Sequence, residues 1–222
     1  MDQPRLAPFR PGTLTVGLYR LAAGKIDVRV QRELLSVLHM EYPSLDQVPG
    51  GIQFSDKYKG KSLTVDLAKV EIEDQDPDSH GTAIQGMTDV FKKVLENINF
   101  PAPYRVRLQA QGTIQGMEDC KPEDALRARF GPPSAWFQDV PGGEVPQTGV
   151  RYVMEGSDAS LREYRIEPWF TRPGHFFVSS SSFSGGAGKE TLNDALTFAR
   201  DEAERVRLLS DRIAADIVKG TA

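Results

Sequence analysis

The chain is poor in the residues that build the commonest chemical sites. Its 222 residues include one cysteine, Cys120, and three histidines. A single cysteine excludes a disulfide within the chain and fits a reducing compartment. The histidines lie in separate segments, so no pair has the HxH or HExxH spacing of a zinc site. The G-x-S-x-G motif of many serine hydrolases is also missing.

Long apolar runs and an excess of one charge are missing too. No apolar run approaches the roughly 20 residues that a membrane helix needs, and the N-terminal segment has no signal-peptide core. The net charge of −4 gives no electrostatic case for nucleic acid or an anionic membrane. A nucleic-acid surface would need arginines from distant segments to cluster: Arg105, Arg107, Arg127, Arg129, Arg162, Arg165 and Arg172. We therefore predict a cytoplasmic protein without a membrane partner, and no motif indicates a cofactor.

A long amphipathic helix near the C-terminus is the clearest element. Its apolar residues recur every three or four positions and form one stripe. They are Leu192, Leu196, Ala199, Ala203, Val206, Leu209, Ile213 and Ile217. Thr191 and Asp194 have the spacing of an N-terminal cap, and Gly220 lies where the helix is expected to end. Because one side is so apolar, this helix must cover a sheet or a partner.

A second stripe predicts a helix over Thr82–Ile98, with Asp78 or Ser79 as its N-cap. Alternation with a period of two predicts strands elsewhere. These are Leu14–Arg20, Ile26–Val30, Leu63–Glu73, Tyr104–Gly112, Arg162–Phe170 and His175–Phe183. The alternation changes phase between Leu67 and Val70, which predicts a bulge or bend near Ala68-Lys69. Pro168 has no N–H, so its strand is expected at a sheet edge or at a bulge.

Together these elements predict an α+β fold, with antiparallel β-sheet and the two main helices packed on one face. Strands followed by a helix occur twice, which suggests two similar strand-strand-helix units. We expect an N-terminal α+β unit over residues 1–130 and a loop or linker, rich in proline and glycine, over residues 131–149. The C-terminal strands and the long helix then occupy residues 150–222. The whole chain is expected to form one compact domain.

A group of short motifs lies in the C-terminal part of the chain. The strand Gly149-Val150-Arg151-Tyr152 precedes a hairpin with Ile166-Glu167-Pro168, Arg172-Pro173 and Phe176-Phe177. With the long helix that follows, this pattern resembles an uncharacterised, sporadically distributed bacterial α+β family. The resemblance implies a bacterial source and a two-unit α+β fold. It brings no established reaction and no catalytic residue.

A glycine-rich loop joins the last predicted strand to the long helix. Its candidate ligand-binding residues are Gly185, Gly186, Gly188 and Lys189. A nucleotide-binding P-loop would need glycine at Phe183 and a hydroxyl residue at Glu190, so the chain departs from that motif at both ends. The loop is interpreted as a strand-to-helix turn that could hold an isolated anion at the helix N-terminus.

An acidic loop supplies a candidate metal site. Its alternate carboxylates and one imidazole suit a hard or borderline cation. The residues are Asp74, Asp76, Asp78 and His80. A calcium-binding EF-hand loop would need glycine at Ser79 and glutamate at Gln85. The alternative interpretation is that the acidic residues cap and flank the start of the second helix.

Large aromatic residues outside the helical stripes are the candidate partner-binding residues. Trp136 and Phe137 lie in the loop rich in proline and glycine, and Trp169 lies beside Pro168. Such residues often anchor interfaces, although they could equally cover the core. The favoured hypothesis is a non-enzymatic module that binds a protein partner or assembles with itself, by sheet-edge addition or aromatic docking. The alternative is an enzyme that binds a metal or a phosphate ligand through Asp74–His80 or Gly185–Lys189.

Overall fold

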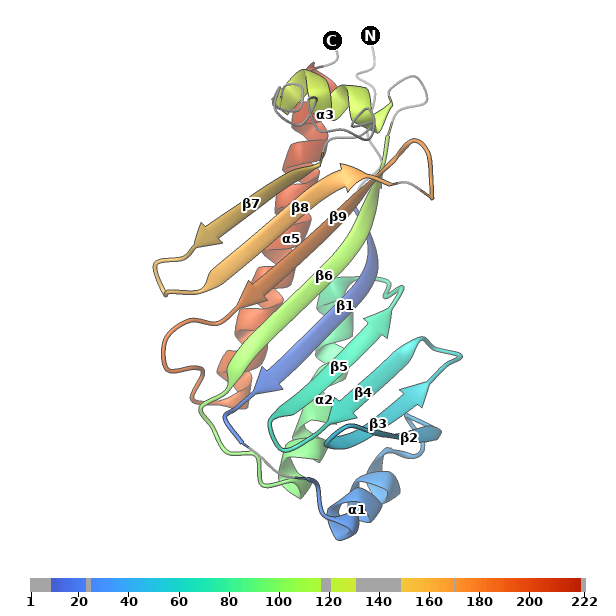
Figure 1. Cartoon of the computed structure of the whole chain (residues 1–222), viewed down its shortest axis with the longest axis vertical. Helices are drawn as coiled ribbons and strands as arrows, with labels where there is room; N and C mark the ends of the chain where they lie inside the picture. Colours follow the sequence, from blue (N-terminus) through green and yellow to red (C-terminus); the bar gives the residue numbers. More distant parts are fainter. Residues whose placement is uncertain (1–8, 23–24, 117–120, 131–148, 170, 221–222) are drawn as a thin grey trace, which may run out of the picture.

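The computed structural model describes residues 9–22, 25–116, 121–130, 149–169 and 171–220. These residues form one antiparallel sheet of nine strands and four helices (Figure 1). The strands are β1 Arg10–Tyr19, β2 Ser44–Val48, β3 Gly51–Asp56, β4 Lys61–Val65, β5 Lys69–Gln75, β6 Arg105–Gln115, β7 Val150–Glu155, β8 Leu161–Pro168 and β9 His175–Phe183. The helices are α1 Val28–Leu38, α2 His80–Asn97, α3 Pro122–Phe130 and α5 Leu192–Gly220. The predicted α+β class with an antiparallel sheet is confirmed.

The strands follow the order β2-β3-β4-β5-β1-β6-β9-β8-β7. The two central strands, β1 and β6, pair with each other, so that Val16 lies opposite Leu108. The outer strands on each side are consecutive hairpins, which leaves β2 and β7 at the two edges. The single sheet therefore runs without a break across the predicted boundary between residues 1–130 and 150–222.

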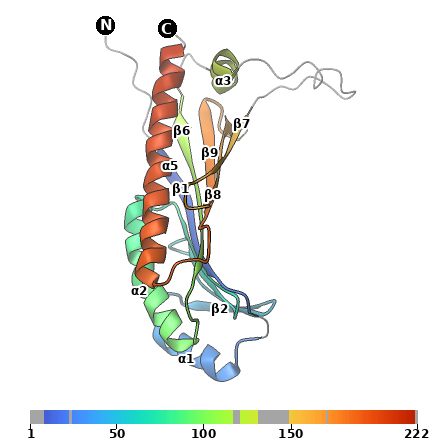
Figure 2. The same cartoon turned by 90° about the vertical axis from the view of Figure 1, so that its left-hand side faces the viewer.

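One face of this sheet carries the core. Alternate residues of the central strands are fully or almost fully buried: Leu14, Val16 and Leu18 of β1, and Val106, Leu108, Ala110 and Ile114 of β6. Helices α2 and α5 lie beside each other along this face (Figure 2), where α2 contacts β1 and β5 and α5 contacts β6 and β9. The other face is mostly polar, as expected for an antiparallel sheet with helices on one side. No helix within the described residues is both long and apolar enough to cross a membrane.

The predicted helix starts have the expected caps. The Ser79 hydroxyl accepts the Thr82 N–H at 3.1 Å, which makes Ser79 the N-cap of α2. At the start of α5, the Thr191 hydroxyl accepts the Asp194 N–H at 3.1 Å and also bonds the Asp194 carboxylate at 2.7 Å. Each cap satisfies an N–H that the helix cannot pair internally.

Two predicted strands are wrong. Residues 26–30 form no strand, because Asp27 accepts the Arg29 N–H at 2.6 Å and starts helix α1 at Val28. The predicted strand Leu63–Glu73 is a hairpin of β4 and β5, and the Asp66 carboxylate accepts the Ala68 N–H at 2.7 Å in the turn. The change of phase in the alternation therefore marks a reversal of the chain, and the predicted bulge or bend within one strand is wrong.

The expected edge position of the Pro168 strand is also wrong. Strand β8 lies between β7 and β9, and Pro168 is its last residue. The ladder between β7 and β8 ends at the pair Val150 and Ile166. The Trp169 N–H, one residue further on, donates to the His175 carbonyl at 2.8 Å. Because hydrogen bonds alternate between the two sides of a strand, the missing N–H of Pro168 falls on the β7 side, beyond the end of that ladder.

Candidate functional site

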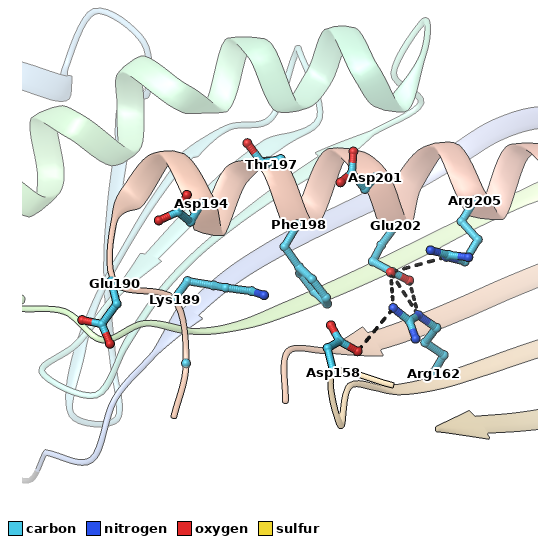
Figure 3. A pocket seen from close by; sticks show the side chains of 11 residues that line it. Asp158, Arg162, Lys189, Glu190, Asp194, Thr197, Phe198, Asp201, Glu202 and Arg205 are labelled. Atoms are coloured by element: carbon cyan, nitrogen blue, oxygen red, sulfur yellow. Dashed lines mark hydrogen bonds and ion pairs between the residues drawn. The ribbon is translucent and has the colours of Figure 1, made fainter. Parts of the chain in front are cut away.

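A cavity of about 540 Å³ lies beside the first turns of α5 (Figure 3). Its walls come from α5, from β8, from the turn between β7 and β8, and from the loop between β9 and α5. Most of the side chains that line it are charged. The carboxylates are Asp158, Glu190, Asp194, Asp201 and Glu202, and the cations are Arg162, Lys189 and Arg205. This arrangement suits a polar or charged ligand better than an apolar one.

A buried ion pair forms one wall of this cavity. The Arg162 Nε donates to both Glu202 carboxylate oxygens, at 3.0 and 2.8 Å, and its Nη2 donates to Oε1 at 2.7 Å. Glu202 is 2% exposed and also accepts the Ser182 hydroxyl at 3.1 Å and an ion pair from Arg205 at 3.4 Å. The hydrogen bonds to Glu202 raise the pKa of Arg162 above its ordinary value. Because every oxygen of Glu202 has a partner, we interpret this pair as a structural wall.

Of the predicted ligand-binding residues, Gly188 and Lys189 line the cavity. Figure 3 shows the Lys189 side chain pointing along the cavity towards Phe198, whose ring centroid lies 5.0 Å from Nζ. The ammonium is therefore held over an aromatic face by a cation–π contact. Lys189 belongs to the loop just before α5, where an anion would also meet the positive end of the helix.

Close packing explains two of the loop glycines, Gly185 and Gly188. A side chain at Gly185 would clash with the Ala159 backbone at 2.2 Å, and one at Gly188 would meet the Tyr104 carbonyl oxygen at 2.8 Å. Gly188 also has a φ of +102°, which favours glycine. The Lys189 N–H donates to the Tyr104 carbonyl at 2.7 Å, so this amide is not available to a phosphate. Gly185 and Gly186 are not part of the cavity wall.

The four residues of the predicted metal site do not converge. Asp74 is buried, and Lys61 Nζ lies 3.2 Å from its carboxylate. His80 is buried in the first turn of α2, and burial lowers its pKa to about 4. Asp76 and Asp78 are exposed beyond the end of β5. Among the residues that the structure describes, no three His, Cys, Asp or Glu side chains are placed to hold a metal ion.

The predicted partner-binding residues lie in two different situations. Trp136 and Phe137 are outside the described residues. Trp169 is half-buried at the turn between β8 and β9, where the Arg172 guanidinium lies 4.8 Å from its ring centroid. Its ring also lies 6.2 Å from that of Phe177. Trp169 therefore packs within its own hairpin while keeping part of its surface exposed.

The arginines that a nucleic-acid surface would need are divided among several elements. Arg105 and Arg107 lie on β6, while Arg127 and Arg129 lie on α3. Arg162 and Arg165 lie three positions apart on β8, so they point to opposite faces of the sheet. These arginines therefore come from several elements and, on β8, from both faces of the sheet.

Strand β7 is the feature that the sequence analysis did not identify as a site. It lies at the sheet edge and is exposed along almost its whole length (Figure 1). Its exposed side chains include three large apolar ones, Tyr152, Val153 and Met154, and Val153 has 57% of its surface exposed. In the sequence, apolar and polar residues do not alternate clearly along β7, because Tyr152, Val153 and Met154 are three successive apolar residues. Such a pattern does not predict one buried and one exposed face.

The outward hydrogen-bonding groups of β7 can be assigned from its turn. The Gly156 N–H donates to the Ser160 carbonyl at 2.8 Å, one position beyond the pair Glu155 and Leu161. Since hydrogen-bonded pairs alternate in an antiparallel ladder, the even-numbered residues of β7 bond to β8. The N–H and C=O groups of Arg151, Val153 and Glu155 therefore point away from the sheet.

An apolar patch continues from β7 across the polar face. Leu161 of β8 lies opposite Phe183 of β9, and both side chains are exposed. Val153 projects from the same face, since its partner Glu163 is two residues from Leu161. The Arg107 guanidinium lies 5.4 Å from the Phe183 ring centroid and borders the patch.

Comparison of the sequence with protein-family models and with curated proteins found no match.

Proposed function

We propose that this protein is a non-enzymatic interaction module whose binding surface is the outer edge of β7. The observation that carries the proposal is an edge strand with outward backbone groups and three exposed, large apolar side chains. Natural edge strands are usually protected by lysine, proline, bulges or a covering segment. The β7 sequence, Val150–Glu155, contains neither lysine nor proline. A partner strand would extend the sheet and cover the apolar side chains.

The other edge of the sheet is less suited to this role. Strand β2 is five residues long and has Asp46 at its centre. It also lies close to α1, since the Gln47 side chain donates to Gln31 at 3.2 Å. A charge at the centre of a short edge strand opposes the approach of another strand. We therefore place the partner on β7.

The aromatic anchors predicted from the sequence extend the same proposal. Trp169 and Phe177 lie on the face of the sheet that also carries Val153, beyond the Val150 end of β7. A partner strand longer than β7 would reach the exposed part of Trp169. Trp136 and Phe137 remain proposed anchors because of their residue type alone.

The experiment that tests this proposal compares two edges of one protein. Val153→Pro removes an outward N–H and leaves the ladder with β8 intact, so it blocks strand addition at β7. Leu45→Pro on β2 is the matched control: Val48 and Gly51 close a two-residue turn as a hydrogen-bonded pair, so the Leu45 N–H points away from the sheet. Affinity-tagged protein is used to capture binding proteins, and thermal unfolding shows that both variants are folded. A partner that is lost only with Val153→Pro supports the proposal; equal capture by all three proteins contradicts it.

The cavity at α5 supports a second candidate function, binding of a small anionic ligand. The supporting observation is that Lys189 lines a cavity of about 540 Å³ next to the start of α5. Inorganic phosphate is a suitable probe, with Lys189→Met as the variant that removes the charge. Thermal unfolding should shift upward with phosphate in the unchanged protein and less in the variant. No shift in either protein would exclude this function.

We also propose that the chain consists of two similar units. Each half begins with a central strand, β1 or β6, followed by a helix, a run of hairpins and a long helix. The first strand of each half pairs with the last strand of the same half, β1 with β5 and β6 with β9. The two first strands pair antiparallel with each other, so a two-fold rotation would relate the units.

A further inference from the structure

We infer that the partner at β7 is a second copy of this chain, paired antiparallel with β7 so that Val153 lies opposite Val153 of the partner subunit. This inference rests on the proposed function, because it needs β7 to be a binding edge. The pairing is a closed two-fold arrangement, in which each copy uses the same surface. Two sheets then become one continuous sheet, with the β2 strands at its outer ends.

The backbone of β7 is compatible with this arrangement. The outward residues Arg151, Val153 and Glu155 are those that would form hydrogen-bonded pairs with a new strand. With Val153 at the two-fold axis, Arg151 lies opposite Glu155 of the partner subunit. Each of the three residues then donates its N–H to, and accepts an N–H from, the residue opposite. All the outward groups of the strand are used.

The side chains select this register over its neighbours. Val153 at the axis places Arg151 opposite a carboxylate at both ends of the ladder, and opposite charges stabilise such cross-strand pairs. Moving the axis to Tyr152 would place Arg151 opposite Val153. Moving it to Met154 would place Glu155 opposite Val153. Each of those registers loses both charge pairs and shortens the ladder.

The apolar side chains of β7 also find apolar partners in the same register. On the face that carries the apolar patch, Val153 contacts its own copy across the axis, with Leu161 on the neighbouring strand. On the helix-bearing face, Tyr152 lies opposite Met154 of the partner subunit, and thioether–aromatic contacts are favourable. The charged residues at the ends and the apolar residues at the centre make β7 complementary to itself.

The geometry of the sheet leaves room for this contact. Figure 1 shows β7 as the outermost strand on its side, and α5 contacts β6 and β9 further inside. The shared ladder is only six residues long. It would bury less area than the roughly 1,200–2,000 Å² of a typical stable interface. We therefore expect a dimer that forms and dissociates with protein concentration.

The test is the mass of the full-length chain in solution, measured by sedimentation velocity over a wide range of concentrations. The mass should rise from 24.6 kDa towards twice that value as the concentration increases. Arg151→Glu and Glu155→Arg each place like charges opposite one another, so each single variant should stay monomeric. The double variant carrying both changes restores opposite charges and should dimerise again. Asp46→Lys on β2 is the matched control and should dimerise as before.

Several results would overturn the inference. These are a monomer at every concentration, a dimer that neither single variant weakens, and single variants that the double variant does not restore. Arg151 also forms an ion pair with Glu163 at 2.8 Å, so Arg151→Glu removes a contact within the chain. If that variant is less stable than the unchanged protein, the mass of Glu155→Arg is the measurement that tests the charge pair. If the chain is monomeric but still captures another protein through Val153, the partner is not a second copy of the chain, and the proposed function is unaffected. A monomer that captures no protein through Val153 would disprove the proposed function as well.

Discussion

The Arg162 guanidinium and the Glu202 carboxylate join β8 to α5 through both carboxylate oxygens. The Glu202 side chain is almost fully buried and Arg162 keeps 14% of its side-chain surface exposed. Burying one charge without its partner is strongly unfavourable, whereas an apolar pair of similar volume is often tolerated. The pair therefore adds a charged contact between β8 and α5, made by two residues forty positions apart.

Removing one partner of this pair should destabilise the fold more than removing both. We expect Glu202→Leu to lower the free energy of unfolding by about 3 kcal/mol, because it leaves Arg162 without its main partner. The double variant Arg162→Met, Glu202→Leu should regain most of that loss. Urea unfolding of the single and double variants measures both values. Additive effects of the two changes would show that the residues do not act as a pair.

A second contact between the same two elements should contribute less. The Tyr164 hydroxyl and the Ser210 hydroxyl are 2.9 Å apart in a buried position, and burial raises the pKa of Tyr164 to about 12. Tyr164→Phe should cost about 1 kcal/mol, since Ser210 still donates to the Val206 carbonyl at 2.7 Å. Urea unfolding checks the stability. Burial also raises the pKa of Tyr19 to about 12, so ultraviolet titration of Tyr164→Phe beside the unchanged protein checks that the variant has one tyrosine fewer that ionises near pH 12. A loss as large as that of Glu202→Leu would contradict this ranking.

The buried imidazole of His80 should make the protein less stable in acid. Its ring packs edge-on against Phe9 at 5.6 Å, and its Nε2 is buried without a hydrogen-bond partner. Burial lowers the pKa of His80 from 6.5 to about 4, although a hydrogen bond to the Gln111 backbone opposes this shift. Between these pH values the unfolded chain binds more protons than the folded one. The free energy of unfolding should therefore fall as the pH drops from about 6.5 to about 4, by up to roughly 3 kcal/mol.

The contribution of His80 can be isolated by comparison with a neutral replacement. His80→Gln removes the titrating group, so its unfolding free energy should depend less on pH between 4 and 6.5 than that of the unchanged protein. His39→Gln, at an exposed position in the residue after α1, is the matched control. Chemical unfolding at several pH values gives the comparison. Parallel curves for His80→Gln and the unchanged protein would refute the assignment.

Two glycines should respond to alanine in opposite directions. Gly188→Ala combines a φ of +102° with a clash against the Tyr104 carbonyl, so it should destabilise the protein by about 1–3 kcal/mol. Gly86→Ala lies on the exposed side of α2 with open space around it, and should stabilise by about 0.5–1 kcal/mol. Thermal unfolding of both variants tests this pair of predictions. Equal effects would mean that packing against Tyr104 does not explain the glycine at 188.

Local sequence patterns predicted the helices better than the strands. Helix α5 has a stripe and a cap that are both local, so Thr191 and Asp194 could be recognised before the fold was known. The β4–β5 hairpin was missed because its turn, Asp66–Ala68, contains neither glycine nor proline. The sheet order could not be predicted, since the central pairing joins Val16 to Leu108. Such distant pairs leave no periodic signal along the chain.

The candidate sites were also predicted only in part, because they too depend on contacts between residues far apart in the sequence. The glycines before α5 marked a loop that does line a cavity, but their spacing could not show that Tyr104 occupies the Lys189 amide. The acidic loop suggested a metal site because its carboxylates alternate, yet the end of β5 separates buried Asp74 from exposed Asp76. The exposure of β7 depends on its edge position, which follows only from the assembled sheet.

The central position of β1 has a consequence for the growing chain during synthesis. Strand β1 is made first, whereas β6, which covers one of its sides, follows only after α2. A nascent chain that ends near Asn97 already contains β5 but leaves the β6 side of β1 uncovered. Once β6, β9, β8 and β7 have joined the sheet, the edge strand on this side is β7 instead of β1. A ribosome-bound chain and a finished chain therefore present different strands to their surroundings.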